Sequence, residues 1–207
     1  RMKKKRVGVR LFKAFVLCIL LLGIVGVAAG GVFVKHVIDN TPEVTAKDIL
    51  PQGYTTSIVD QNGTVLEQLK DSDSNRVYKK YDEISKYMGD AFVAIEDERF
   101  YKHNGIDLQG IIRAGVVGVT HGFHFTEGAS TLTQQLIKNN IFEGGNEDTF
   151  GEKLERKIQE QYLAIQLEKI MDKKIILKNY LNTINLGNNT LGVKAAALRY
   201  FDKDVSD

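Results

Sequence analysis

Three acidic residues and a histidine fall within positions 96–105 of the 207-residue sequence. The stretch reads Glu-Asp-Glu-Arg-Phe-Tyr-Lys-His-Asn-Gly and follows a segment with helical apolar spacing. A carboxylate whose pKa is tuned by its neighbours can act as a general base, so this stretch is a candidate for proton transfer. The alternative is ordinary solvated surface, because charged residues are mostly exposed. His103 taken alone would more often be a structural hydrogen-bond partner.

A second group occupies positions 128–139 and reads Gly-Ala-Ser-Thr-Leu-Thr-Gln-Gln-Leu-Ile-Lys-Asn. Thr131, Gln135 and Lys138 are spaced i, i+4, i+7, so on a helix they form one polar stripe that ends in a cation. Such a stripe could face a substrate with hydroxyls and phosphates. The small residues before it could expose backbone N–H groups at a helix start, where anions are favoured. The alternative is a capped helix with a solvated polar face.

A third group places Arg156 four residues before Glu160, with Lys157 between them. Opposite charges at this spacing meet on a helix surface. As a surface pair they would contribute only about 0.2–1 kcal/mol. The functional interpretation is that Arg156 binds a phosphate while Glu160 holds the cations in place.

Together the three groups resemble the peptidoglycan glycosyltransferase domain (glycosyltransferase family 51) of class A penicillin-binding proteins and monofunctional cell-wall transglycosylases. The resemblance covers roughly residues 75–205 and continues with Glu168-Lys169, Ile176-Leu177, Tyr180-Leu181-Asn182, Gly187, Gly192, Ala195-Ala196 and Tyr200-Phe201. Departures are Ala129 in place of a second Gly, Lys178 in place of an acidic residue and Asn185 in place of Tyr. Because the family continues beyond Tyr200-Phe201, and because the chain opens on Arg1, we expect a segment of a longer protein.

The resemblance implies a mainly α, lysozyme-like fold with a cleft between two lobes. It implies that the 4-hydroxyl of lipid II attacks the anomeric carbon of a lipid-linked glycan chain, with inversion and release of polyprenyl diphosphate. The implied catalytic residues are Glu96, as general base, and Glu160, which orients the cationic cluster. The implied substrate-binding residues are Lys138 and Arg156 at the diphosphate, Ser130, Thr131 and Gln135 along the pocket, and Asp97, Phe100 and His103 around Glu96.

Mg²⁺ or Mn²⁺ could share the work at the substrate diphosphate; no protein metal ligands and no organic cofactor are predicted. Other cell-wall synthesis and division proteins are candidate partners. Two alternatives stay open: a lysozyme-like peptidoglycan hydrolase, and a non-catalytic membrane scaffold of cell-wall assembly. A hydrolase needs no diphosphate site, and a scaffold would be expected to have lost Glu96, Lys138 or Arg156.

The N-terminus predicts a membrane anchor. Residues 14–34 form an uncharged run of 21 residues, long enough at about 1.5 Å per residue to cross the roughly 30 Å hydrocarbon core. A cleavable signal peptide is the alternative, but its apolar core is usually only about 7–15 residues long. The basic residues before the run predict a cytoplasmic N-terminus, with the catalytic domain outside the bacterial cell membrane.

Charge and composition exclude other classes. Residues 1–35 carry eight Lys or Arg, which leaves 20 of the 28 basic residues against all 26 acidic ones. The basic excess is therefore terminal, and we expect no nucleic-acid surface. The one cysteine, Cys18, lies in the apolar run, which excludes a disulfide framework and a cysteine metal site.

Four regions are expected: a basic tail at 1–13, a transmembrane helix at 14–34, a linker with a β-hairpin at 35–74, and the glycosyltransferase domain at 75–207, C-terminally incomplete. Strands are predicted at 55–59 and 64–69, joined by Gln61-Asn62-Gly63. Helices are predicted at 84–95, 107–119, 130–140, 152–169, 173–183 and 192–200. Thr131 and Gln134 are spaced as a capping box. The apolar, Gly-containing stretch 110–125 predicts either buried core or a membrane-facing flap.

Overall fold

The computed structural model describes residues 2–51, 56–69, 77–122, 128–142, 144–188 and 190–206. It divides into two compact units, residues 1–42 and residues 43–207. The first unit is built on one long helix. The second holds a small sheet and the helices that carry the site.

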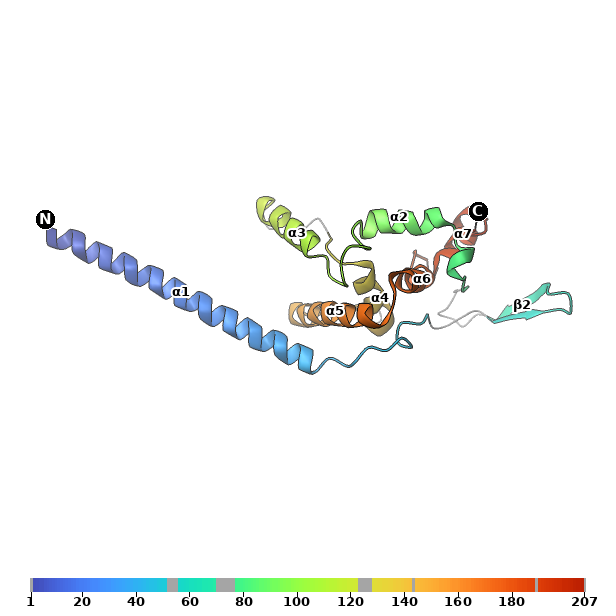
Figure 1. Ribbon diagram of the computed structural model, residues 1–207, viewed down its shortest axis with the longest axis horizontal. Helices are drawn as coiled ribbons and strands as arrows, with labels where there is room; N and C mark the ends of the chain where they lie inside the picture. The colour runs from blue at the N-terminus through green and yellow to red at the C-terminus, as the bar shows by residue number, and fades with distance from the viewer. Residues whose placement is uncertain are drawn as a thin grey trace. The chain divides into compact units, whose positions relative to one another are not determined.

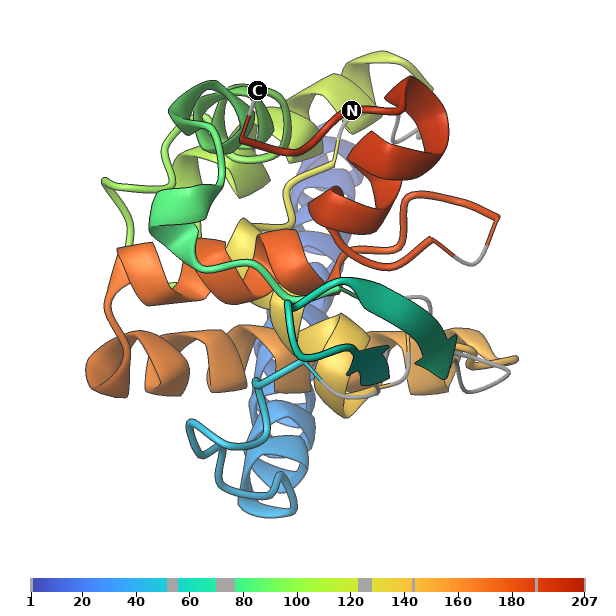
Figure 2. The same ribbon diagram turned by 90° about the vertical axis from the view of Figure 1, so that its right-hand side faces the viewer.

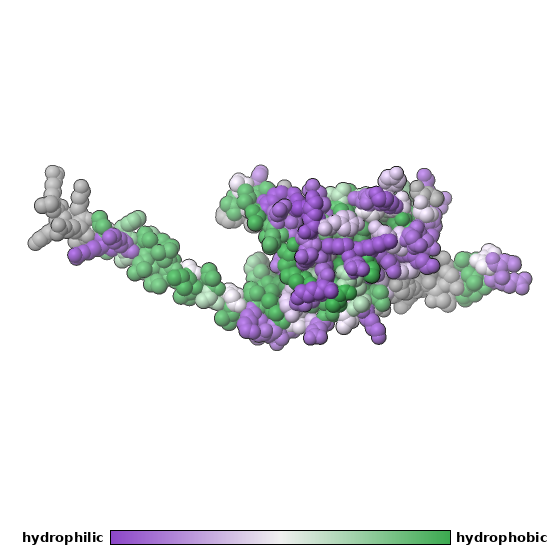
Figure 3. Space-filling model, in the orientation of Figure 1, coloured by the Kyte–Doolittle hydropathy of each residue, from purple (hydrophilic) through white to green (hydrophobic). Residues whose placement is uncertain are grey.

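Helix α1 (Met2–Asp39) is the long helix of the first unit, and its apolar middle stands out in the hydropathy view (Figure 3). It is the one helix in the described part of the chain that is long and apolar enough to cross a membrane. The expected linker from residue 35 begins later, because the helix continues to Asp39. Lys35 pairs with Asp39 at 2.7 Å, and the Thr41 hydroxyl donates to the Val37 carbonyl at 2.7 Å. These contacts stabilise the last turns.

Strands β1 (Thr56–Val59) and β2 (Val65–Leu69) confirm the predicted hairpin. Gly63 has φ +83°, a conformation that glycine adopts without strain. The Asp60 carboxylate accepts hydrogen bonds from the backbone N–H groups of Asn62 and Thr64, both at 2.8 Å. The predicted start at Thr55 lies outside the described residues.

The rest of the second unit is helical, which confirms the mainly α prediction (Figures 1 and 2). A 3₁₀ turn at Tyr81–Glu83 precedes α2 (Lys86–Glu96), α3 (Leu108–Thr120), α4 (Leu132–Ile141), α5 (Phe150–Ile170), α6 (Lys173–Thr183) and α7 (Val193–Phe201). In both views α2 and α3 lie on one side of α6 and α5 lies on the other.

Helices α4, α5 and α6 form the core, because each buries one apolar stripe against the others. The fully buried members include Leu132, Leu136 and Ile137 of α4, Leu163 and Leu167 of α5, and Ile176, Leu177 and Leu181 of α6. Burial of each such side chain contributes roughly 1.5–3 kcal/mol. The core thereby fixes α4 and α5, the two helices that carry most of the predicted site.

The start of α4 differs from the prediction. The helix begins at Leu132, not at residue 130, and Thr131 is its N-cap. The Thr131 hydroxyl accepts a hydrogen bond from the Gln134 backbone N–H at 3.2 Å. The reciprocal half of the predicted capping box is wrong, because the buried Gln134 side chain donates instead to the Gly105 carbonyl at 3.4 Å. A complete capping box occurs at the start of α5, between Thr149 and Glu152.

Candidate functional site

A cavity of about 470 Å³ lies where the end of α2 meets α4 and α5. It is lined by the predicted site residues Glu96, Ser130, Gln135, Lys138, Arg156 and Glu160, and also by Ile95, Gly128, Asn139 and Lys157. Residues up to 65 positions apart, from Ile95 to Glu160, are thereby brought around one cavity. The predicted residues Asp97, Phe100, His103 and Thr131 are not part of this lining.

Glu96 is the last residue of α2, and its side chain is exposed at the cavity. Its Oε2 accepts a hydrogen bond from the Gln135 side-chain amide at 2.9 Å. Among the described residues, no donor reaches the other carboxylate oxygen, Oε1. One oxygen is therefore held in place, and the other can receive a proton from a bound hydroxyl.

The buried side chain of Asp97 joins the end of α2 to the start of α4. Asp97 Oδ2 accepts a hydrogen bond from the Leu132 backbone N–H at 3.0 Å, where the helix dipole favours a negative charge. His103 Nε2 lies 3.0 Å from both Asp97 oxygens, and Phe100 packs edge-to-face against the His103 ring. These three side chains lie behind the cavity, where they fix the backbone that carries Glu96.

The loop that ends at Gly105 is locked against α4 and α5. The Gly105 carbonyl accepts a hydrogen bond from the Thr131 hydroxyl at 2.8 Å, and Thr131 is only 1% exposed. Gly105 has φ +90°, and a Cβ at this position would lie 2.6 Å from the Ala164 carbonyl group. No real Cβ approaches backbone so closely, so the contact between the loop and α5 requires glycine.

The opposite wall of the cavity is cationic and is organised by Glu160, which is 1% exposed. Arg156 Nη1 contacts Glu160 Oε1, and Lys157 Nζ lies 2.8 Å from Glu160 Oε2. Arg156 Nε also forms an ion pair with Glu147 Oε2 at 2.7 Å. The guanidinium group holds the pKa of Glu147 below its usual value. Lys157 also donates to the Ser130 hydroxyl at 2.6 Å.

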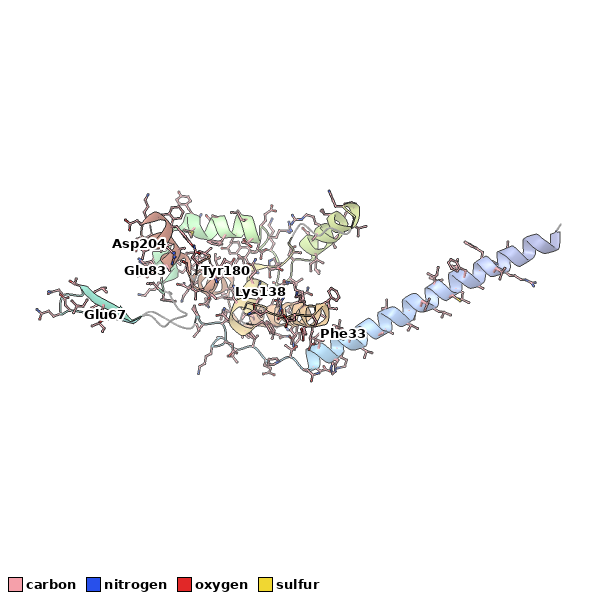
Figure 4. All side chains as sticks on the ribbon, turned by 180° about the vertical axis from the view of Figure 1, so that it is seen from behind. Phe33, Glu67, Glu83, Lys138, Tyr180 and Asp204 are labelled. Carbon is pink, nitrogen blue, oxygen red and sulfur yellow. The ribbon has the colours of Figure 1, made fainter. Side chains whose placement is uncertain are left out.

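Lys138 lies on α4, one turn after Gln135, and is half-buried at the cavity (Figure 4). In the described ranges no carboxylate pairs with its ammonium group. Arg156 and Lys157 are occupied by carboxylates of the protein, whereas the charge of Lys138 is available to an anion. Three cations around one cavity, with a carboxylate at its edge, can bind a phosphate group beside a proton acceptor.

The sequence-based prediction assigned no site role to Lys157, Glu147 or Tyr180. Lys157 lines the cavity, and its i, i+3 spacing to Glu160 was a usable signal. Glu147 comes from the loop between α4 and α5, and no local pattern marks it. Tyr180 donates from α6 to Gln135 at 3.0 Å across 45 positions of sequence, a pairing that only the packing of the helices creates.

Helix α3 presents an apolar stripe. Leu108, Ile112, Val116 and Val119 recur at helical spacing and are 58–68% exposed. The opposite face contains Gly110, Ala114 and Gly118, which are buried. The predicted flap thus corresponds in part to α3, and its residues 123–125 lie outside the described residues.

The described side chains include no group of three or more His, Cys, Asp or Glu residues that could hold a metal ion. Glu160 is already bracketed by two cations, so Glu96 is the cavity carboxylate with an oxygen to offer. The described residues therefore do not fit a metal centre built from protein side chains alone.

Comparison with known proteins gives a consistent result. The family model described as "Transglycosylase" matches residues 62–207. Penicillin-binding protein 1A of Clostridium perfringens (strain 13 / Type A) is 42% identical over 201 residues, which cover 96% of this chain and 29% of that protein. Penicillin-binding protein 1A of Clostridium botulinum (strain Langeland) is 38% identical over 99% of this chain and 24% of its own length. Penicillin-binding protein 1A/1B of Bacillus subtilis (strain 168) is 36% identical over 96% and 21%. The chain thus spans less than a third of the length of these relatives.

Proposed function

The chain belongs to the transglycosylase family, and from this premise we propose that it is a peptidoglycan glycosyltransferase that polymerises lipid II into β-1,4-linked glycan strands. The observation that carries the proposal is the cavity in which Glu96 stands at one edge and Lys138, Arg156 and Lys157 stand around the rest. A transferase that uses a diphosphate leaving group requires both features, a base for the acceptor and cations for the diphosphate.

The proposed reaction begins with the acceptor. The 4-hydroxyl of lipid II is a weak nucleophile, and Glu96 Oε1 takes its proton as the oxygen attacks the anomeric carbon of the lipid-linked glycan chain. The new C–O bond forms on the face opposite the leaving group, so the configuration inverts. The old C–O bond breaks with its electron pair on the polyprenyl diphosphate, and Glu96 is left protonated.

The cations act on the leaving group. Negative charge grows on the diphosphate as the bond breaks, and fixed cations stabilise that charge without having to reorganise. Lys138 can approach the diphosphate freely, because the described residues give its ammonium group no partner. Glu160 contacts both Arg156 and Lys157, which supports the proposal that this carboxylate orients the two cations.

We propose that a divalent cation, where one takes part, is bound by the substrate and not by a metal site of the protein. Mg²⁺ or Mn²⁺ would be held mainly by the diphosphate oxygens, because the cavity offers it one available carboxylate. No step of the proposed reaction needs it, since the charge on the leaving group is met by side chains.

We also propose that the protein works at the bacterial cell membrane, with a single span and its catalytic domain outside the cytoplasm. Helix α1 has the length and composition to cross a bilayer, and basic residues precede its apolar run. The exposed apolar stripe of α3 suits contact with lipid. An enzyme tethered to the membrane meets its lipid-linked substrates at high effective concentration. Other cell-wall synthesis and division proteins remain proposed partners.

The test is to incubate the purified full chain, in detergent or lipid vesicles, with lipid II and separately with finished glycan. We expect lipid II to be converted into longer glycan strands, with no shortening of finished glycan. The Glu96→Gln variant serves as the control for background polymerisation. Shortening of finished glycan would support the hydrolase alternative, and inertness towards both substrates would support a scaffold; either result would overturn the proposal.

A further inference from the structure

A buried phenol lies directly behind the proposed base. Tyr180, on α6, is 0% exposed, and its ring packs edge-to-face against Phe92 with centroids 5.8 Å apart (Figure 4 labels Tyr180). Its hydroxyl donates a hydrogen bond to Gln135 Oε1 at 3.0 Å. Tyr180 does not line the cavity, so it acts on a substrate only through a neighbour.

Gln135 connects this phenol to Glu96, and the chemistry of the two ends fixes how its amide points. An ionised carboxylate only accepts hydrogen bonds, so the Glu96 oxygen at 2.9 Å must face the amide NH₂ group. The amide oxygen then faces α6, where it needs a donor, and the Tyr180 hydroxyl supplies one. If the amide were reversed, its oxygen would face the carboxylate and repel it.

We propose that Tyr180 is a positioning residue for the glycosyl transfer, because its hydroxyl locks the Gln135 amide and thereby holds the Glu96 carboxylate in its working orientation. The inference rests on the proposed function, since it assigns Glu96 the role of base. With Oε2 fixed by Gln135, Glu96 presents Oε1 to the acceptor hydroxyl. The reacting oxygen atoms are thus aligned before the substrate binds, which lowers the barrier to proton transfer.

The phenol is suited to this task because it remains a donor. Burial, together with the nearby negative charge of Glu96, raises the pKa of Tyr180 well above its usual value. The hydroxyl therefore keeps its proton throughout the catalytic cycle. The surrounding helices hold the ring rigid, so the amide oxygen is met by a donor of fixed position.

The first test is Tyr180→Phe in the full chain, which removes the hydroxyl but keeps the ring that packs against Phe92. We expect kcat for lipid II polymerisation to fall about 10-fold, with KM changed less than about twofold, because only the orientation of the base is lost. The melting temperature should stay close to that of the wild type. Tyr200→Phe is the matched control. The Tyr200 hydroxyl, on α7, donates to the Leu186 and Gly187 carbonyls, and none of these three residues lines the cavity, so the activity of this variant should be unchanged.

A double-mutant cycle separates positioning from general packing. If Tyr180 acts only through Gln135, then Tyr180→Phe added to Gln135→Ala should cause no further loss of kcat. Additive losses, a raised KM, or a fall in activity that only follows a fall in melting temperature would overturn the inference. Full activity of Tyr180→Phe beside an inactive Glu96→Gln would overturn this inference alone, whereas an active Glu96→Gln would overturn the proposed mechanism as well.

Discussion

The cavity holds two glutamates in opposite environments. Glu96 is exposed, is held by one neutral amide, and keeps one carboxylate oxygen without a donor from the described residues. Glu160 is 1% exposed and has a cation at each oxygen, Arg156 on one and Lys157 on the other. The two residues are of the same type, but their environments suit them to different roles.

This difference decides which glutamate can move a proton. Both oxygens of Glu160 contact cations, so this carboxylate has no oxygen left for a bound hydroxyl. Glu96 makes no ion pair with the described residues, and its Oε1 faces no donor from them. In a site with two carboxylates, environments that differ in this way separate the acid–base group from the electrostatic one.

The largest expected effect comes from removing the charge of each glutamate in turn. Glu96→Gln should lower polymerisation by about 10²–10⁴-fold, the usual loss on removing a positioned base, with little change in melting temperature. Glu160→Gln removes the negative charge that pairs with Arg156 and Lys157, and it should destabilise the fold by about 1–3 kcal/mol. Polymerisation of lipid II and thermal unfolding are measured for both variants. If Glu96→Gln and Glu160→Gln lost equal stability, the proposed division between a proton-accepting glutamate and a structural one would be wrong.

The second effect compares two cations. Lys138→Ala should lower polymerisation about 10²-fold at nearly unchanged stability, because this ammonium group stabilises only the leaving group. Arg156→Ala should lower both activity and melting temperature, since Arg156 pairs with Glu147 and Glu160. The exposed Lys169 provides the control, and Lys169→Ala should change neither.

Arg156→Lys refines the test of the cationic wall. A lysine keeps the charge but cannot contact two carboxylates and a phosphate with one planar group, so it should restore only part of the lost activity. Full recovery of both activity and melting temperature would show that charge alone matters at this position.

The helices were predictable from the sequence because apolar residues recur at helical spacing. Ile158, Tyr162 and Ile165 place α5 correctly, although the large apolar side chains that this helix buries fully are Leu163 and Leu167. Asn62-Gly63 marks the hairpin turn. The end of α1 was not predictable in the same way. The stop in apolar sequence at residue 34 suggested an end there, whereas polar side chains extend the helix to Asp39.

The site was predictable only as separate motifs. Each motif contains residues that line the cavity, but no spacing shows that Gln135 contacts Glu96 or that Lys157 reaches Ser130. The first contact depends on how the end of α2 lies against α4, and the second on how α5 lies against the residues that precede α4. The stripe of Thr131, Gln135 and Lys138 also divides in the structure, because Thr131 is buried as the N-cap of α4 while the other two line the cavity. The roles of these residues towards substrate stay predictions.

A third prediction compares the glycines that support the two walls. At Gly105 an added Cβ would meet the rigid backbone of α5 at 2.6 Å, whereas at Gly145 it would meet the Arg156 guanidinium at 2.9 Å. Both positions have positive φ. Gly105→Ala should therefore destabilise the protein by about 3 kcal/mol or more, and Gly145→Ala by about 1–2 kcal/mol. Gly145→Ala should also lower activity by displacing Arg156. Chemical denaturation measures both, and Gly144→Ala is the control, because Gly144 also has positive φ but has open space around an added Cβ.

The smallest expected effect is a loss of folding stability at acidic pH, and it involves only the ion pair between Glu147 and Arg156 in the cationic wall. The Arg156 guanidinium lowers the pKa of Glu147 from its ordinary value of 4.5, so the folded state favours the ionised form more than the unfolded state does. The resulting stabilisation is complete above about pH 4.5 and is lost as the pH falls through the lower, folded-state pKa. Its size should be small, because partly exposed ion pairs contribute little.

Glu147→Gln removes this titrating group and should make the variant less stable than the wild type at pH 7, with the difference shrinking as the pH falls below 4.5. Denaturant midpoints of both proteins at pH 7 and at about pH 3 measure the change. A difference that stayed constant with pH would mean that Glu147 acts through packing and not through its charge. Arg156 would then depend on Glu160 alone for electrostatic positioning. The difference between Glu160, which holds the cations, and Glu96, which holds none among the described residues, would be greater than the contact between Arg156 and Glu147 suggests.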